Sequence, residues 1–276
     1  MKMGRAFVIL FLLTIAAVTG VNAVGVSLEE KPIVVVIPSY NNKDWCEYNL
    51  GSALAQEYHN FRIIYIDDAS SDGTGDLVEK YVKEWDTENR VTLIHNEERV
   101  GALANTYRGV WLCQPDEIVA ILDGDDWFAH VRVLEKLNAV YSDPNVWASY
   151  GQFQYYPCGS PGWAREIPAE IIERNEIRYY DWVTTHLRTF YAGLFQKINV
   201  RDLFYNNQFF STAGDLAYTW PIMEMAGTHS RFVPDVLYTY NIASPLNDSK
   251  VNPNLQMYFT YIIRSKERYA PLKSPY

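Results

Sequence analysis

The sequence predicts an α/β fold with a mainly parallel, Rossmann-like sheet and helices on both faces. Short apolar runs rich in Val and Ile alternate with longer segments of helical periodicity over residues 32–127, which is typical of βαβ units. The apolar runs have almost no polar interruption, as in strands that are buried on both faces. Polar or acidic residues follow three of the runs directly, where sheets of this kind place their ligand sites.

The predicted elements of the first half follow one another in a regular order. A first strand is expected at 32–37, because this run is apolar throughout after Lys31. A turn-rich segment at 69–74 separates the second strand from the helix that follows it. We expect helices at 44–57, 74–85, 101–111 and about 131–141, and further strands at 62–66, 91–95 and 118–122.

The second half, beyond about residue 128, is less regular and is rich in Tyr, Trp and Phe. Helical patterns are present at 181–198 and 215–226, and a strand is expected at 236–240. We find no internal repeat and no low-complexity linker in the sequence. The sequence therefore predicts one continuous fold in which the second half completes the sheet.

Composition excludes some classes of function. The chain has 276 residues, of which 48% are apolar, so it can fold around a sizeable core. Its net charge of −9 argues against a nucleic-acid partner, because nucleic-acid phosphates need a basic patch. The cysteines, Cys46, Cys113 and Cys158, are too few and too scattered for a zinc site or a disulfide framework.

The N-terminus has the pattern of a targeting or anchoring segment. Lys2 and Arg5 precede an uncharged stretch that continues to Leu28. We interpret residues 1–28 as a signal peptide, cleaved after Ala23, or as an uncleaved anchor that is long enough to span a bilayer. We expect membrane association through this segment, in the membrane or in the lumen of the secretory pathway. An anchored domain that faces the cytosol is the alternative.

The acidic motif after the strand at 118–122 is the most informative feature of the chain. It consists of Asp123, Gly124, Asp125 and Asp126. Like charges at this spacing repel one another, and their burial is unfavourable. A divalent cation removes this conflict, and Mn²⁺ and Mg²⁺ prefer oxygen ligands. The motif predicts a metal–diphosphate site, and a surface turn whose Asp residues cap the next helix is the alternative.

Two further strands also end in polar residues. Residues 38–41 follow the first strand, and Asp67 and Asp68 follow the second. Because ligands of open α/β sheets bind outside the carboxyl ends of the strands, we expect these residues and the acidic motif to face one crevice.

Together these motifs resemble the family 2 glycosyltransferases of the GT-A fold, over about residues 32–242. The motifs that carry the resemblance are Ile37-Pro38-Ser39-Tyr40-Asn41, Asp67-Asp68-Ala69-Ser70-Ser71-Asp72-Gly73-Thr74, Asn96 with Arg99-Val100-Gly101-Ala102 and Asn105, Asp123-Gly124-Asp125-Asp126-Trp127, and Gly214-Asp215-Leu216. The resemblance implies that residues 29–276 form one GT-A domain. Residues 29–127 would be its nucleotide-binding half and residues 128–276 its acceptor-side half.

The resemblance implies roles for residues at the donor end of the crevice. Pro38, Tyr40 and Asn41 would bind the nucleotide, with the Tyr40 ring against the base. Asp68 would accept a hydrogen bond from the base, for which an ionised carboxylate is suited. Arg99 would contact the diphosphate, although a surface cation is an equal alternative.

The same resemblance implies the metal ligands. Asp123 would lie near the ribose, and Asp125 together with Asp123 would hold Mn²⁺ or Mg²⁺ at the diphosphate. His229 would be a further ligand, with an ordinary hydrogen-bonded histidine as the alternative. Asp126 would position this site or cap the next helix.

Asp215 is the residue that we expect to act as the general base. Family members invert the sugar, and the base is usually the Asp of an acidic pair early in a helix. This chain departs from that pattern because Gly214 stands where Glu is commoner. An N-cap Asp is the alternative for Asp215. We expect Glu224, further along the same helix, to be structural.

The predicted function is that of an inverting, metal-dependent glycosyltransferase. We expect it to transfer a sugar from a nucleotide-sugar donor, for which a UDP-sugar is the first choice, to a hydroxyl of a glycan, lipid or protein acceptor. A non-catalytic carbohydrate-binding protein on the same fold is the alternative. A nucleotidyltransferase is disfavoured because residues 38–42 contain neither glycine nor arginine.

Overall fold

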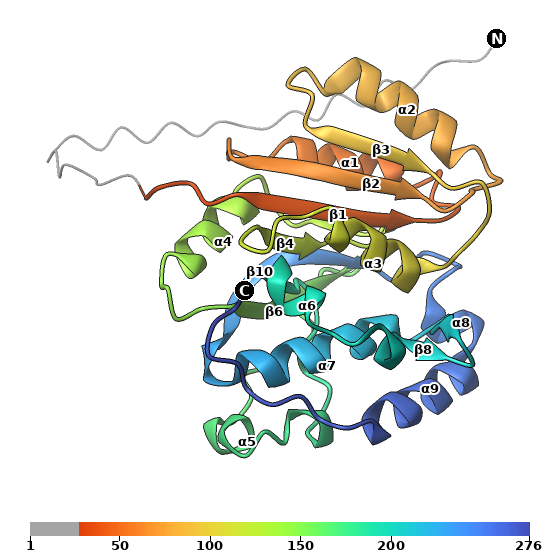
Figure 1. Cartoon of the computed structure of the whole chain (residues 1–276). Helices are drawn as coiled ribbons and strands as arrows, with labels where there is room; N and C mark the ends of the chain where they lie inside the picture. The colour runs from red at the N-terminus through yellow and green to blue at the C-terminus, as the bar shows by residue number, and fades with distance from the viewer. Residues whose placement is uncertain (1–27) are drawn as a thin grey trace, which may run out of the picture.

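The computed structural model describes residues 28–276 (Figure 1). The predicted signal peptide or anchor at 1–28 therefore lies outside the described residues, except for Leu28. Among the helices of the described part, none combines the length and apolar composition that a membrane span requires.

Within residues 28–276, one large sheet runs through the molecule, as predicted. Its strand order is β3-β2-β1-β4-β7-β6-β10-β5. The strands β1, β2, β3 and β4 are parallel to one another, and so are β6 and β10, whereas β7 and β5 pair antiparallel. The strands are β1 (Ile33–Ser39), β2 (Phe61–Asp67), β3 (Val91–His95), β4 (Ile118–Ile121), β5 (Trp127–Phe128), β6 (Ala148–Tyr156), β7 (Thr189–Tyr191) and β10 (Ser230–Asn241).

Helices cover both faces of this sheet. The strand order reverses after β3, so right-handed crossovers place α1 and α2 on one face and α3 on the other. Figure 1 shows α3, α6 and α7 on the near side of the sheet. A Cβ at Gly109 of α3 would lie 2.5 Å from Val36 of β1, so this glycine permits close packing. The main helices are α1 (Cys46–Leu54), α2 (Thr74–Trp85), α3 (Ala102–Trp111), α4 (Val133–Tyr141), α6 (Ala192–Gln196) and α7 (Gly214–Ala226).

The remaining elements extend the second half beyond the sheet. The helix α9 packs through Phe259 against Phe210 and Tyr205. The elements are α5 (Ala169–Glu173), β8 (Phe204–Tyr205), β9 (Gln208–Phe209), α8 (Asp248–Val251) and α9 (Pro253–Ser265), with short 3-10 helices at Ile177–Tyr179, Val200–Leu203 and Gly227–His229.

The predictions for the first half are confirmed, and those for the second half are wrong in two places. The predicted helix at 181–198 is instead irregular chain with bends, the strand β7 and the short helix α6. The nine-residue strand β6 and the helix α9 were not predicted. The helix at 215–226 and the strand at 236–240 are present as α7 and β10.

Glu224 has the structural role that the sequence suggested. It lies on α7 with its side chain fully buried and forms a bidentate ion pair with Arg178. The distances are 2.7 Å from Nε to Oε1 and 2.6 Å from Nη2 to Oε2. Arg178 also donates to the carbonyl oxygen of Ile263 at the end of α9. The pair therefore joins α7, α9 and the segment before β7.

Candidate active site

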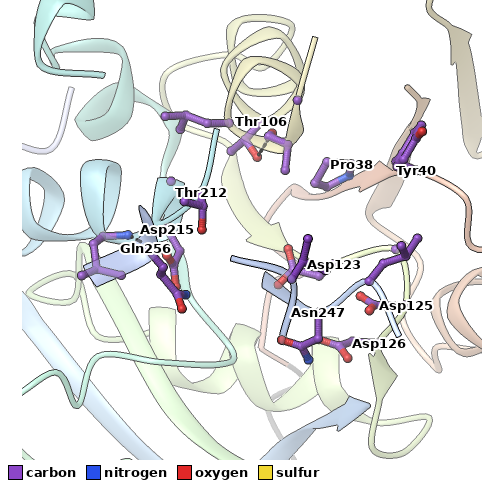
Figure 2. Close-up of a pocket in the computed structure, with 18 of the residues that line it drawn as sticks. Pro38, Tyr40, Thr106, Asp123, Asp125, Asp126, Thr212, Asp215, Asn247 and Gln256 are labelled. Atoms are coloured by element: carbon purple, nitrogen blue, oxygen red, sulfur yellow. Dashed lines mark hydrogen bonds between the residues drawn. The ribbon is translucent and has the colours of Figure 1, made fainter. Parts of the chain in front are cut away.

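A cleft of about 860 Å³ opens at the carboxyl ends of β1, β2 and β4. Pro38, Tyr40 and Asp125 lie on one side of it, and Asp215 and Gln256 lie on the other (Figure 2). The three polar strand ends therefore face one crevice, as predicted. The N-terminal turns of α3 and α7 and residues of α8 and α9 complete its walls.

The acidic loop fits tightly against the loop after β1. A Cβ at Gly124 would lie 2.6 Å from both Ser39 Oγ and Asn42 Nδ2, so only glycine fits between Asp123 and Asp125. The side chain of Asn49 donates to the carbonyl oxygens of Asp123, at 2.9 Å, and Asp126, at 2.7 Å. These contacts fix the backbone of the loop and hence the directions of its carboxylates.

Beside the end of β1, Tyr40 and Arg99 lie together. The Arg99 guanidinium is centred 3.9 Å from the centre of the Tyr40 ring, and both residues line the cleft. Arg99 thus covers one face of the ring that was predicted to meet the base. A base can stack on the other face, or on the guanidinium itself.

Asp68 lines the cleft, but its carboxylate also holds the loop that precedes α3. It accepts hydrogen bonds from the backbone N–H groups of Val100, at 2.9 Å, and Gly101, at 2.8 Å, and from Asn96 Nδ2, at 2.8 Å. Burial by itself would raise the pKa of Asp68, but these hydrogen bonds hold it below its ordinary value. Asp68 is therefore ionised and shapes the donor end of the cleft.

Asn41, which the resemblance assigns to nucleotide binding, makes contacts between two loops in the structure. Its side-chain oxygen accepts from the N–H of Ser71 at 2.9 Å, and its own N–H donates to Ser70 Oγ at 2.9 Å. Asn41 thus ties the loops after β1 and β2 together, and the neighbouring Asn42 lines the cleft instead.

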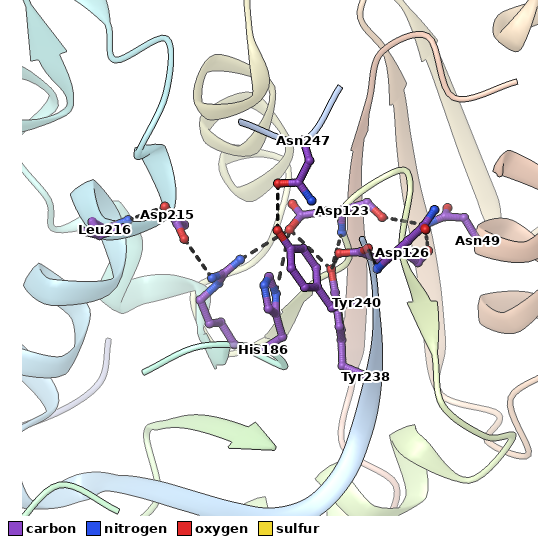
Figure 3. Close-up of polar contacts among 11 residues, drawn as sticks. Asn49, Asp123, Asp126, His186, Asp215, Leu216, Tyr238, Tyr240 and Asn247 are labelled. Carbon is purple, nitrogen blue, oxygen red and sulfur yellow. Dashed lines mark hydrogen bonds and ion pairs between the residues drawn. The ribbon is translucent and has the colours of Figure 1, made fainter. Parts of the chain in front are cut away.

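Asp126 is the buried anchor of the acidic motif. Its two oxygens accept from the Asn241 N–H and the Tyr238 hydroxyl, both at 2.7 Å (Figure 3). Burial, together with the charges of Asp125 and Asp123, raises the pKa of Asp126 well above its ordinary value. The Tyr238 hydroxyl also accepts from the N–H of Asp123, at 3.2 Å. Asp126 therefore connects the motif to β10 rather than capping the next helix.

Two buried side chains reach the cleft from the segment that precedes β7. His186 and Arg188 line the cleft, whereas Leu187 between them is buried. The chain bends at residues 186 and 187, and both side chains reach the cleft. The His186 Nδ1 lies 3.9 Å from Asp123 Oδ2, and the ring stacks on Tyr238, with 4.4 Å between ring centres. Burial lowers the pKa of His186 well below its ordinary value, so the imidazole is neutral.

Arg188 lies between the acidic motif and the predicted base. Its guanidinium is 3.5 Å from Asp123 Oδ2 and 3.2 Å from Asp215 Oδ2, and its side chain is 3% exposed. One buried cation therefore holds two carboxylates from opposite halves of the chain. Figure 3 shows Asp215 on one side of His186 and Asp123 on the other.

Asp215 lies in the first turn of α7, where Ala213 rather than Asp215 is the N-cap residue. Gly214 before it packs against α3, because a Cβ there would lie 2.9 Å from Leu103 Cβ. This close approach explains why a Glu, commoner at this position in the family that the sequence resembles, is absent here.

Comparison with known proteins agrees with this arrangement. Residues 34–203 match the model of the family described as glycosyl transferase family 2. The chain belongs to glycosyl transferase family 2. It is similar to the glycosyltransferase GlyG of Streptococcus pneumoniae, with 32% identity over 54% of the chain and 51% of GlyG. It is also similar to the UDP-Glc:alpha-D-GlcNAc-diphosphoundecaprenol beta-1,3-glucosyltransferase WfaP of Escherichia coli, with 27% identity over 44% of the chain and 45% of WfaP. The chain thus spans about half the length of these relatives.

Solved structures show the same fold. The crystal structure of residues 1–349 of S. aureus TarS in complex with UDP-GlcNAc has a TM-score of 0.63 and 16% identity, over 84% of this chain and 65% of that one. The mannosyltransferase PcManGT of Pyrobaculum calidifontis, in complex with GDP-Man and Mn²⁺, has a TM-score of 0.56 and 20% identity, over 87% and 66%. The fold of this family 2 chain is therefore GT-A, as predicted.

The prediction that His229 is a metal ligand disagrees with the structure. Its Nδ1 lies 2.8 Å from the carbonyl oxygen of Asn145, and its ring stacks on Trp147. His229 precedes β10, whereas Asn241, which contacts Asp126, is the last residue of that strand. A strand of this length places its ends about 30 Å or more apart. His229 is therefore remote from the cleft.

The side chains at the cleft nevertheless fit a divalent cation. Ligand atoms of Asp123, Asp126 and His186 lie within 4.8 Å of one another, and Asp125 also lines the cleft. Within residues 28–276, the buried His186 Nδ1 has no hydrogen-bond partner, although buried polar atoms normally have one. Carboxylate oxygens are ordinary ligands of Mn²⁺, and neutral imidazole is a common protein ligand of metal ions.

No role was assigned to His186 or Arg188 from the sequence. A signal that could have identified them is a histidine and an arginine two residues apart within 181–191, a segment with no other His, Lys or Arg. The helical interpretation of 181–198 did not single out this pair.

Proposed function

We propose that this protein is an inverting, metal-dependent glycosyltransferase that transfers a sugar from a nucleotide-sugar donor to an acceptor hydroxyl. The single observation that carries the proposal is the contact of Arg188 with both Asp123 and Asp215. It brings the predicted donor-side carboxylate and the predicted base to opposite sides of one guanidinium. A donor sugar bound in this cleft would have the diphosphate near Asp123 and the base near its other face.

The roles of the side chains follow from this placement. Asp123 and Asp125 would hold the cation at the donor diphosphate. When bound, this cation stabilises the negative charge of the departing nucleoside diphosphate as a Lewis acid. Asp215 would accept the proton of the attacking acceptor hydroxyl. Arg188 would hold the Asp215 carboxylate in position, because its own side chain is fixed by burial.

We propose a UDP-sugar as the donor. The name of WfaP contains UDP-Glc, and one TarS structure contains UDP-GlcNAc, whereas the PcManGT structure contains GDP-Man. We propose a glycan or lipid as the first acceptor classes to test, with a protein acceptor as a third. We further propose that residues 1–28 associate the protein with a membrane, and protease protection in intact vesicles would report which side the domain faces.

Donor binding and turnover by the full-length protein test the proposal. A panel of UDP- and GDP-sugars would be measured with Mn²⁺ and with chelator, for the wild type, Asp125→Ala and Asp215→Asn. We expect one donor to bind in a metal-dependent manner and Asp125→Ala to abolish this binding. Asp215→Asn should retain binding but lower turnover about 10²- to 10⁴-fold.

Asp235→Asn is the matched control, because Asp235 is an exposed carboxylate on β10 that pairs with Lys136 and does not line the cleft. It should leave binding and turnover unchanged. If Asp215→Asn retains full turnover, another group is the base. If no nucleotide sugar binds under any condition, the non-catalytic alternative is correct.

A further inference from the structure

His186 has an unusual environment for a buried histidine. The residue is 8% exposed, and its ring is stacked on Tyr238 and Tyr240, with the Phe153 ring edge-on. Within the described residues its Nδ1 has no hydrogen-bond partner. An unsatisfied buried polar atom is unfavourable. The aromatic rings fix the imidazole in place, so a bound group is expected to provide the missing partner.

The position of this nitrogen indicates what the group is. Nδ1 lies 3.9 Å from Asp123 Oδ2, which is too long for a hydrogen bond. Two ligands that each lie about 2.0–2.1 Å from one ion can be at most about 4.2 Å apart. The observed separation is within this limit. Asp126 lies close by, but both of its oxygens already accept short hydrogen bonds.

We propose that His186 Nδ1 is a direct ligand of the divalent cation, together with Asp123. The inference rests on the proposed function, since it concerns the cation at the donor diphosphate. An imidazole ligand suits transition metals, whereas Mg²⁺ favours an all-oxygen site. The site therefore selects Mn²⁺ over Mg²⁺. Arg188 contacts the same Asp123 oxygen at 3.5 Å and Asp215 at the shorter 3.2 Å, so it lies beside this site.

Pulsed electron paramagnetic resonance of Mn²⁺ bound to the full-length protein, with and without UDP, tests this assignment. A coordinated imidazole couples its ¹⁴N nucleus to the Mn²⁺ electron spin. We expect a ¹⁴N modulation in the wild type that changes to the ¹⁵N pattern when only the histidines carry ¹⁵N. This measurement needs no variant, so it does not depend on whether a substituted protein folds.

His186→Gln is the direct variant, and His229→Gln is its matched control, because His229 is remote from the cleft. His186→Gln should remove the nitrogen coupling and weaken Mn²⁺ binding about tenfold or more, with a smaller effect on Mg²⁺. His229→Gln should leave both unchanged. Bound Mn²⁺ without nitrogen coupling from histidine would overturn the His186 assignment and leave metal-dependent transfer intact. No Mn²⁺ binding even with UDP would overturn both.

Discussion

The two halves of the domain contribute to the cleft in different ways. In the first half, residues 29–127, the site residues follow the ends of apolar parallel strands, and the strands themselves fix where they lie. In the second half, residues 128–276, they come from the irregular segment before β7 and from the first turn of α7. There, buried charges hold the elements together, namely Arg188 and the pair of Arg178 and Glu224.

This difference indicates that single polar substitutions should disturb the second half more than the first. An apolar strand needs no specific partner for its position, because many contacts share the energy of burial. A buried charge needs its counter-charge, since an unpaired charge in the interior is strongly unfavourable. The predictions below test this contrast, beginning with the largest effect.

Removal of Arg178 should produce the largest loss of stability. Arg178→Met leaves the fully buried Glu224 carboxylate without its cation, which costs about 3–5 kcal/mol in the free energy of unfolding. Urea denaturation monitored by tryptophan fluorescence would measure the change. The comparable variant in the first half is Arg62→Met, because Arg62 pairs with Glu117 at a partly exposed site. That variant should lose only about 0–1 kcal/mol.

The double variant Arg178→Met/Glu224→Leu separates charge from packing. It removes both charges and should regain most of the stability that the single variant loses. A double variant that is as unstable as Arg178→Met alone would contradict the view that an unpaired charge causes the loss.

Arg188→Gln should lower kcat about 10²-fold, because a small misplacement of a catalytic group has effects of this size. Arg188 is a positioning residue that holds Asp215 at 3.2 Å, so the KM for the donor should change little. Steady-state kinetics with the assigned donor would measure both constants. Arg188→Lys keeps the charge and should recover part of kcat. An equal loss in the lysine variant, or a loss confined to KM, would show that Arg188 does not act through Asp215.

In the first half, the charged group that matters is Asp68, and its effect should depend on pH. The pKa of Asp68 is lowered in the folded protein, so its ionised form stabilises the fold. This contribution is fully present above the unfolded pKa of about 3.9 and is lost as the pH falls through the lower folded pKa. Asp68→Asn should therefore be less stable than the wild type by about 1–3 kcal/mol at pH 7.

Urea denaturation at pH 7, 5 and 3 would measure the difference in free energy of unfolding between Asp68→Asn and the wild type, which is called the gap below. The gap should persist at pH 5 and shrink towards pH 3, whereas Asp76→Asn, at an exposed position on α2, should show little gap at any pH. A gap between Asp68→Asn and the wild type that is independent of pH would mean that the charge of Asp68 is not what stabilises the loop before α3.

The same contrast explains what sequence reasoning could and could not predict. Asp68 and Asp123 were placed correctly in one crevice, because a residue at the end of a parallel strand has a known position. β7 is only three residues long and lies buried between β4 and β6, so it has no periodicity to recognise. His186 and Arg188 were therefore not located.

The error on His229 has a related cause. A histidine that follows a helix looks available for a site, but its place depends on the direction of the next strand. β10 continues from Ser230 towards the cleft, so its start and His229 lie at the far end. The loop contact of Asn41 was not foreseen for a local reason, because its left-handed backbone conformation, with φ of 52°, goes with a contact to the loop after β2.

The smallest expected effect concerns thiol reactivity. The labelling rate of buried cysteines reports whether the first half stays folded when a substitution destabilises the second half. Cys46 and Cys113 lie buried in the first half, and burial raises the pKa of Cys46 to about 11 and that of Cys113 to about 12. Cys158 is exposed in the second half, and hydrogen bonding with Ser160 lowers its pKa. Because the thiolate is the reactive form, iodoacetamide at pH 8 should label Cys158 first.

Mass spectrometry of the labelled peptides gives this order directly, and Cys158→Ser should show only slow labelling of the other two. In Arg178→Met, faster labelling of Cys46 and Cys113 would mean that loss of the ion pair opens the whole domain. If only regions of the second half open, Cys46 and Cys113 should stay as protected as in the wild type. This protection is the result we expect at low urea, because the core around β1, β2 and β4 is apolar and contains no part of the Arg178–Glu224 pair.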